Sequence, residues 1–185
     1  MIQIPSTGKL LISDPTLDDY YFNKSVILIA DYNKKDGSFG IIINKPINTK
    51  LNDILYDFSD FDSQLYLGGP IKTDRIFFIH TLGNIIEGSK KILDGIYWGG
   101  DVNTVKYMIK NKEINSENIR FFIGYSGWAP MQLEEEIENH SWIISKTTAN
   151  DIIHIKPKKL WRDLILHSGK EHAMWANFPR NPKLN

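Results

Sequence analysis

The amino-acid sequence predicts an α+β fold in a single domain, with a mixed and strongly curved β-sheet flanked by helices. Three observations support this class. The chain has 185 residues, the size of one ordinary domain. Neither an internal repeat nor a linker of biased composition divides it. Strand-like runs and helical patterns follow one another without strict alternation, which argues against a regular succession of βαβ units.

The first predicted elements form a β-hairpin. Residues 25–32 and 38–44 are two nearly continuous apolar runs, and Asp36-Gly37 lies between them as a turn signal. Strands that are apolar throughout are typical of positions covered on both faces, so we expect layers on both sides of this hairpin. Further strands are predicted over residues 64–67, 75–80, 95–98, 119–123 and 141–145.

Four helices are predicted around these strands. Asp101 is a suitable N-cap for one helix, and Pro157 suits the first turn of another, which Gly169 would stop. A shorter helix is expected over residues 51–56, and a fourth begins near Pro130. The two longer helices carry apolar stripes at helical spacing: Val102, Val105, Met108 and Ile109, then Leu160, Trp161, Leu164 and Ile165.

The composition excludes several kinds of site. The chain contains no cysteine, which excludes disulfides, thiolate nucleophiles and cysteine-ligated metal centres and fits a reducing compartment. The N-terminal residues lack the pattern of a signal peptide, and no apolar run approaches the roughly 20 residues of a membrane span. We therefore expect a cytoplasmic protein that has no contact with membrane and no cofactor.

Charge is distributed unevenly along the chain. Residues 1–155 carry 15 Lys and Arg against 20 Asp and Glu, whereas residues 156–185 carry 7 against 2. The basic cluster of Lys156, Lys158, Lys159 and Arg162 could touch a phosphate backbone. No DNA-reading module is visible, however, so we favour a basic C-terminal segment lying on an acidic body, with residues from about 171 to 185 as a tail packed on that body.

The segment Gly124-Tyr-Ser-Gly-Trp128 has two readings. A strand, a glycine corner and a helix resemble the nucleophile elbow of hydrolases, with Ser126 as nucleophile, but Trp128 replaces the last glycine of that motif. Spacing cannot place a base among His80, His140, His154, His167 and His172. The structural reading, which we favour, has both glycines at positive φ and the rings of Tyr125 and Trp128 buried around the reversal, held by Gln132 and Glu136.

Two further motifs lie where apolar strands end. Asn44-Lys45-Pro46 follows the hairpin, and Gly68-Gly69-Pro70 follows the strand at residues 64–67. Gly68-Gly69 lacks the lysine and the Ser or Thr of a phosphate loop. Strand ends that share one side of a sheet form clefts in which ligands bind. The candidate binding residues of such a cleft are Asn44, Pro46, Gly68, Gly69, Pro70, Tyr125, Trp128, Gln132 and Glu136.

No metal site is predicted. The spacing of the acidic residues matches no known calcium loop, and His167 and His172 flank a predicted helix end, which is poor ligand geometry. Solvated side chains are the favoured interpretation of these acidic residues, which are Asp18, Asp19, Asp60, Asp62 and Glu134 to Glu136.

Several motifs, in order, resemble the YqgE/AlgH family of bacterial proteins. They are Pro15-Thr-Leu-Asp-Asp19 with Phe22 and residues 25–27, Gly40-Ile-Ile-Ile-Asn-Lys-Pro46, Leu67-Gly-Gly-Pro70, and Gly124-Tyr-Ser-Gly-Trp128 with residues 132–137. The ending, through residues 175–179 to Asn185, resembles members from Bacteroidetes-type bacteria. The resemblance implies a cytoplasmic protein with a barrel-like curved sheet. It implies no catalytic residues, because the activity of the family is largely undefined and its pattern accepts alanine at Ser126.

These observations leave three functional hypotheses. The leading one is a non-enzymatic regulatory or adaptor protein that binds a protein or a small ligand through the strand-end cleft. The alternative is a transcriptional regulator, a label often given to the family, that contacts nucleic acid through the basic C-terminal segment. The third and least favoured is a hydrolase built on Ser126.

Overall fold

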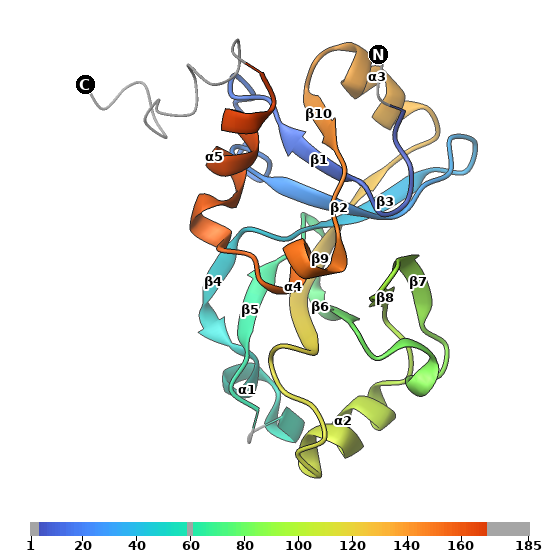
Figure 1. Ribbon diagram of the computed structural model, residues 1–185, viewed down its shortest axis with the longest axis vertical. Helices are drawn as coiled ribbons and strands as arrows, with labels where there is room; N and C mark the ends of the chain where they lie inside the picture. The colour runs from blue at the N-terminus through green and yellow to red at the C-terminus, as the bar shows by residue number, and fades with distance from the viewer. Residues whose placement is uncertain (1–3, 59–60, 170–185) are drawn as a thin grey trace.

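The structure, a computed structural model, describes residues 4–58 and 61–169 and confirms the α+β class (Figure 1). Ten strands form one curled sheet, with β10-β1-β2-β3-β9-β6-β8-β7 as its main order and the pair β4–β5 attached to β9. The strands are β1 (Leu10–Ser13), β2 (Val26–Asp31), β3 (Ser38–Ile42), β4 (Pro46–Lys50), β5 (Gln64–Leu67), β6 (Ile71–His80), β7 (Lys90–Leu93), β8 (Ile96–Trp98), β9 (Ile119–Trp128) and β10 (Trp142–Ser145).

In the described part of the chain, five α-helices cover this sheet: α1 (Leu51–Ile54), α2 (Val102–Lys110), α3 (Gln132–Glu138), α4 (Ala149–Ile153) and α5 (Pro157–His167). The cap of α2 is as predicted, since the carboxylate of Asp101 accepts hydrogen bonds from the backbone N–H groups of Asn103 and Thr104. Pro157 occupies the first turn of α5. Val102 departs from the predicted stripe because it is exposed on the first turn of α2.

The predicted hairpin is β2–β3, an antiparallel pair in which Leu28 lies opposite Ile41. Alternate residues of β2 enter different cores. Leu28 packs in the core beneath α4 and α5, whereas Ile27 and Ile29 pack in the core beneath α3. Both faces of this hairpin are therefore covered, as the continuous apolar runs predicted.

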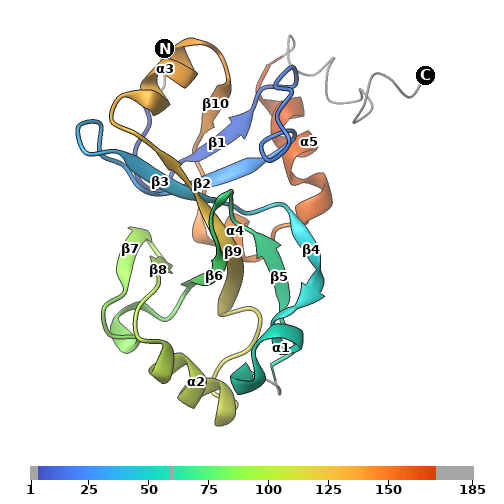
Figure 2. The same cartoon turned by 180° about the vertical axis from the view of Figure 1, so that it is seen from behind.

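Strand β9 is the axis of the fold. Its first half lies between β5, a parallel neighbour, and β6, an antiparallel one. Its second half pairs with β3, and Gly124, at φ +67°, lies between the two halves. A glycine at such a point allows the sharp bend of a barrel corner. The sheet curls at this bend, so that α5 and β4 lie on one side of the molecule and β7 and β8 on the other (Figures 1 and 2).

The sequence-based prediction around residues 119–131 was wrong in three respects: the end of the strand, the start of the helix and the conformation of Gly127. The strand does not end at Ile123 but continues to Trp128, and the reversal follows at residues 129–131. Met131, at φ +67°, occupies the N-cap position of α3, which begins two residues later than Pro130. Gly127 is not among the glycines at positive φ. Instead, a Cβ at Gly127 would lie 2.9 Å from the side chain of Ile71, so close packing explains this glycine.

Candidate functional site

The strand-end glycines bring two backbones together. A Cβ on Gly68 would lie 2.2 Å from the carbonyl oxygen of Gly124, and one on Gly69 would lie 2.3 Å from that of Tyr125. Contacts under 3 Å to backbone atoms leave no room for any side chain, which is the close approach that glycine in a strand marks. Gly68 and Gly69 are buried against β9, and half-buried Pro70 follows them, directly before β6.

A second group of candidates forms a joint at the end of β9, which we call the tryptophan joint (Trp128, Gln132, Glu136 and Trp142). The Glu136 carboxylate accepts hydrogen bonds from the indole N–H groups of Trp128 at 2.8 Å and Trp142 at 2.7 Å. Gln132 donates to the other carboxylate oxygen at 2.8 Å and accepts from the backbone N–H of Ala129. These bonds confirm that Gln132 and Glu136 reach back to the preceding loop, and they tie β9, α3 and β10 together.

Ser126 lies within β9 rather than on an elbow. Its side chain is fully buried, and its hydroxyl donates to the carbonyl oxygen of Gly68 at 3.1 Å. A nucleophile must reach its substrate, and this one is sealed between two strands. His80 is also occupied elsewhere, since its Nε2 lies 2.9 Å from the carbonyl oxygen of Gly99. The geometry therefore offers no support for Ser126 as a nucleophile.

Tyr125 points to the opposite face of β9 from Trp128, and its ring is half-buried rather than buried as the sequence-based interpretation had it. It packs edge-on against Phe39 at 6.0 Å and Phe77 at 5.5 Å between ring centroids. With Trp98, these half-buried rings line a groove of about 530 Å³, which we call the aromatic groove. Trp128 also borders this groove, although its side chain is only 6% exposed.

Asn44 and Pro46 belong to a different and larger groove, of about 860 Å³, between the strand ends and α5. We call it the basic groove. Its lining includes the charged side chains of Lys24, Lys45, Lys158 and Arg162 and the rings of Tyr20 and Trp161, and among the residues that the structure describes it includes no Asp or Glu.

Two cations of the basic groove, Lys24 and Lys45, are held in place by contacts with the protein. Asn44 is buried and accepts a hydrogen bond from the backbone N–H of Val26 while donating to the carbonyl oxygen of Lys24. The ammonium group of Lys24 lies 5.2 Å from the centroid of the Trp161 ring. Lys45 donates to the carbonyl oxygen of Tyr21. Positioned charges lose less conformational entropy on binding a ligand than mobile ones.

The first turn of α5 strengthens the positive potential of the groove. Pro157 and Lys158 line it from the N-terminal end of that helix, which carries the partial positive charge of the helix dipole. Trp161 anchors the helix, since its ring is buried and its N–H donates to the carbonyl oxygen of Ser13 at 2.9 Å. The arrangement can attract and hold an anion.

The structure thus separates the residues that the sequence grouped into one cleft. Asn44 and Pro46 line the basic groove, whereas Tyr125 and Trp128 line the aromatic groove. Sequence reasoning found Lys158 and Arg162 as basic residues but did not connect them with Lys24 and Lys45. Only the fold brings these four together, because they come from segments far apart in the chain. Asp60 and His172, also considered as ligands, and the tail from about residue 171 lie outside the described residues.

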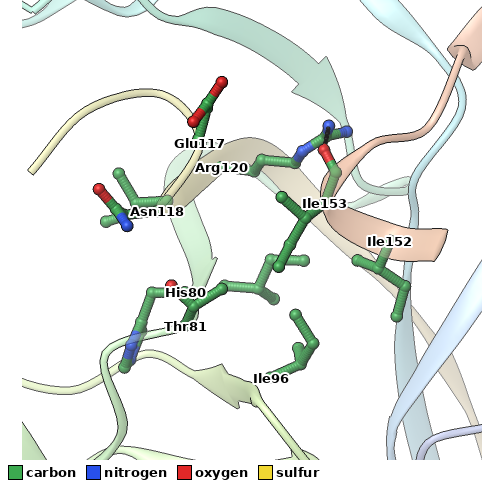
Figure 3. A pocket seen from close by; sticks show the side chains of 10 residues that line it. His80, Thr81, Ile96, Glu117, Asn118, Arg120, Ile152 and Ile153 are labelled. Atoms are coloured by element: carbon green, nitrogen blue, oxygen red, sulfur yellow. Dashed lines mark hydrogen bonds between the residues drawn. The ribbon is translucent and has the colours of Figure 1, made fainter. Parts of the chain in front are cut away.

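A third pocket lies beneath α4, with His80 of β6 and Arg120 of β9 on different sides of it (Figure 3). Its volume of about 10 Å³ admits at most one water molecule. Arg120 donates to the carbonyl oxygen of Ile153 at the end of α4, and its guanidinium carbon lies 5.6 Å from the centroid of the Tyr66 ring. Burial lowers the pKa of Arg120 from its ordinary value. This pocket is a helix anchor rather than a ligand site.

Within residues 4–58 and 61–169, no group of three or more His, Cys, Asp or Glu side chains is arranged to hold a metal ion. The same part of the chain contains no helix that is long and apolar enough to span a membrane.

Comparison with known proteins identifies relatives of this chain. The AlgH-like family pattern matches residues 10–173. A UPF0301 protein from Bacteroides fragilis is 42% identical over 184 residues, which cover 98% of this chain and 92% of that protein. One from Cytophaga hutchinsonii is 38% identical over 179 residues, which cover 96% of this chain and 98% of that protein.

Two solved structures share the fold. A protein from Corynebacterium diphtheriae superposes with a TM-score of 0.76 at 21% identity, covering 95% of this chain and 94% of the other. The AlgH protein from Pseudomonas aeruginosa gives 0.72 at 23% identity, covering 97% and 98%. At these identities the likeness concerns the fold alone.

Proposed function

The chain belongs to the AlgH-like family, and from that premise we propose that it is a non-enzymatic binding protein that holds the phosphate group of a ligand in the basic groove. One observation carries this proposal: Lys24, Lys45, Lys158 and Arg162 surround a single groove, and no carboxylate among the described residues lines it. Charge-assisted hydrogen bonds to phosphate are stronger than neutral ones, and Arg adds bidentate geometry. A protein that carries its ligand without changing it acts as a regulator or adaptor. We place this role in the cytoplasm, as the sequence predicts.

A calorimetric titration with inorganic pyrophosphate at low ionic strength tests this function. Lys158 and Lys159 are adjacent, exposed residues of α5, and Lys158 lines the groove whereas Lys159 does not. Losing one hydrogen bond to a charged group costs about 1.5–3 kcal/mol, so Lys158→Ala should weaken binding at least about tenfold. Lys159→Ala should leave the affinity unchanged. Failure of the wild type to bind, or equal effects of the two variants, would contradict the proposal.

Contact of α5 with nucleic acid is the second candidate. The observation that favours it is the exposure of Lys156, Lys158 and Lys159 on the first turn of this helix. A duplex lying across the turn would use all three charges, so Lys158→Ala and Lys159→Ala should weaken binding equally. Each should also reduce the dependence of affinity on salt concentration by about one ion. Dependence on Lys158 alone would exclude this mode.

A further inference from the structure

An exposed aromatic ring stands at the basic groove. Tyr20 is 90% exposed and lines the groove beside the cations, although a large ring gains most from burial. Within the described residues its ring contact is with Tyr21, edge-on at 5.1 Å between centroids. The faces of the Tyr20 ring are therefore open to a ligand.

The turn that presents Tyr20 is built by its own hydrogen bonds. The carboxylate of Asp19 accepts from the backbone N–H groups of Tyr21 and Phe22, each at 2.8 Å, and the N–H of Asn23 donates to the carbonyl oxygen of Asp19 at 3.0 Å. Lys45, which also lines the groove, donates to the carbonyl oxygen of Tyr21. These bonds fix the backbone that carries Tyr20 relative to Lys45, so a ligand need not order this turn.

From this arrangement we infer that the ligand of the basic groove is a nucleoside phosphate, with its phosphate on the cations and its base stacked on Tyr20. The inference rests on the proposed function, which concerns the phosphate group, and adds the nucleoside part of the ligand. Exposed aromatic rings beside a positively charged groove are how proteins hold single nucleotides and single strands without reading their sequence. The volume of about 860 Å³ leaves room for more than one phosphate group. A free nucleotide and the end of a single strand offer the same chemistry.

The test compares two ligands that differ only in the base. AMP and ribose 5-phosphate are titrated into the full chain by calorimetry, together with Tyr20→Ala and Tyr20→Phe. Tyr56→Ala is the matched control, because Tyr56 is 95% exposed and does not line the groove. Stacking of one base contributes about 1–3 kcal/mol, so AMP should bind about 5- to 150-fold more tightly than ribose 5-phosphate. Tyr20→Ala should abolish that ratio, and Tyr20→Phe and Tyr56→Ala should keep it.

The two proposals fail in different ways. If ribose 5-phosphate binds through Lys158 but AMP binds no more tightly, the anion site stands and the nucleoside inference is overturned. If neither ligand binds, both are overturned. A short single-stranded oligonucleotide separates the two sources of the ligand: tighter binding than AMP, with a steeper salt dependence, identifies a strand, and equal binding identifies a free nucleotide. Either result supports the inference, provided that Tyr20→Ala weakens the binding of AMP or of the oligonucleotide.

Discussion

The tryptophan joint and the basic groove use polar groups in opposite ways. In the joint, the Glu136 carboxylate is matched by the indole N–H groups of Trp128 and Trp142, so the cluster is complete within the protein. In the basic groove, cations from four positions gather around a space that no carboxylate of the described residues lines. A cluster that satisfies itself stabilises the fold. Cations gathered around an open groove attract a ligand of the opposite charge.

The comparison also shows why a conspicuous motif need not be a site. Gly124-Tyr-Ser-Gly-Trp128 attracts attention in the sequence, yet its residues build a strand that bends at Gly124 and ends at the tryptophan joint. Lys24 stands in no motif, Lys45 stands in the Asn44-Lys45-Pro46 motif, and both share a groove with α5 only through folding. The predictions below separate the residues that hold β9 from those that hold a ligand.

The largest expected effect is that of Gly68→Ala on stability. The new Cβ would meet the carbonyl oxygen of Gly124 at 2.2 Å, and backbone on both sides cannot yield as a flexible side chain would. We expect a loss of more than about 4 kcal/mol in the free energy of unfolding, measured by urea denaturation. Gly99→Ala is the control, since a Cβ there meets nothing within 4 Å and only the positive φ is strained. If Gly68→Ala and Gly99→Ala lose the same unfolding free energy, the backbone at Gly68 does not pack tightly against β9.

The next largest loss in the free energy of unfolding is expected for Trp128→Ala. Removing a buried aromatic side chain costs about 3–5 kcal/mol, and here it also leaves the Glu136 carboxylate with one donor fewer. The neighbouring variant Ser126→Ala should cost only about 0.5–1.5 kcal/mol, because the carbonyl oxygen of Gly68 still accepts from the N–H of Ile42 at 2.8 Å. A thermal melt that shows little change in Trp128→Ala would contradict the structural role of the joint.

A smaller, pH-dependent effect is expected at His80. Burial lowers the pKa of His80, and its Nε2 lies within hydrogen-bond distance of the carbonyl oxygen of Gly99. The unfolded chain therefore takes up the proton first as pH falls below about 6.5. The stability contributed by neutral His80 is fully present above that pH and declines below it. The difference in unfolding free energy between the wild type and His80→Gln should shrink from about pH 8 to about pH 5; a constant difference would contradict this account.

Much of the fold could be predicted from the sequence because its signals are local. The hairpin β2–β3, the cap at Asp101 and the proline that opens α5 depend on neighbouring residues, and the structure confirms them. Strands β1, β4 and β7 and helix α4 were missed. Each is five residues or fewer, a length that gives no clear period, but β5 and β8 are as short and were predicted, so length alone does not separate the two groups.

The candidate site was less predictable for a physical reason. Asn44 follows the end of β3, whereas Pro46 begins β4, and which strand ends share a groove depends on how the sheet curls at Gly124. In the curled sheet, Tyr125 and Trp128 line the aromatic groove, whereas Asn44 and Pro46 line the basic groove together with residues of α5. Hydrogen bonds across four helical positions, as between Gln132 and Glu136, were predictable because their geometry is local.

The most direct test of the whole comparison is one thermal-shift measurement, made with and without pyrophosphate. A ligand that binds only the folded state raises the melting temperature. We predict that Trp128→Phe melts below the wild type but keeps the pyrophosphate shift, whereas Lys158→Ala melts like the wild type and loses the shift. If Trp128→Phe loses the shift while Lys158→Ala keeps it, the tryptophan joint is the binding site and the basic groove is not.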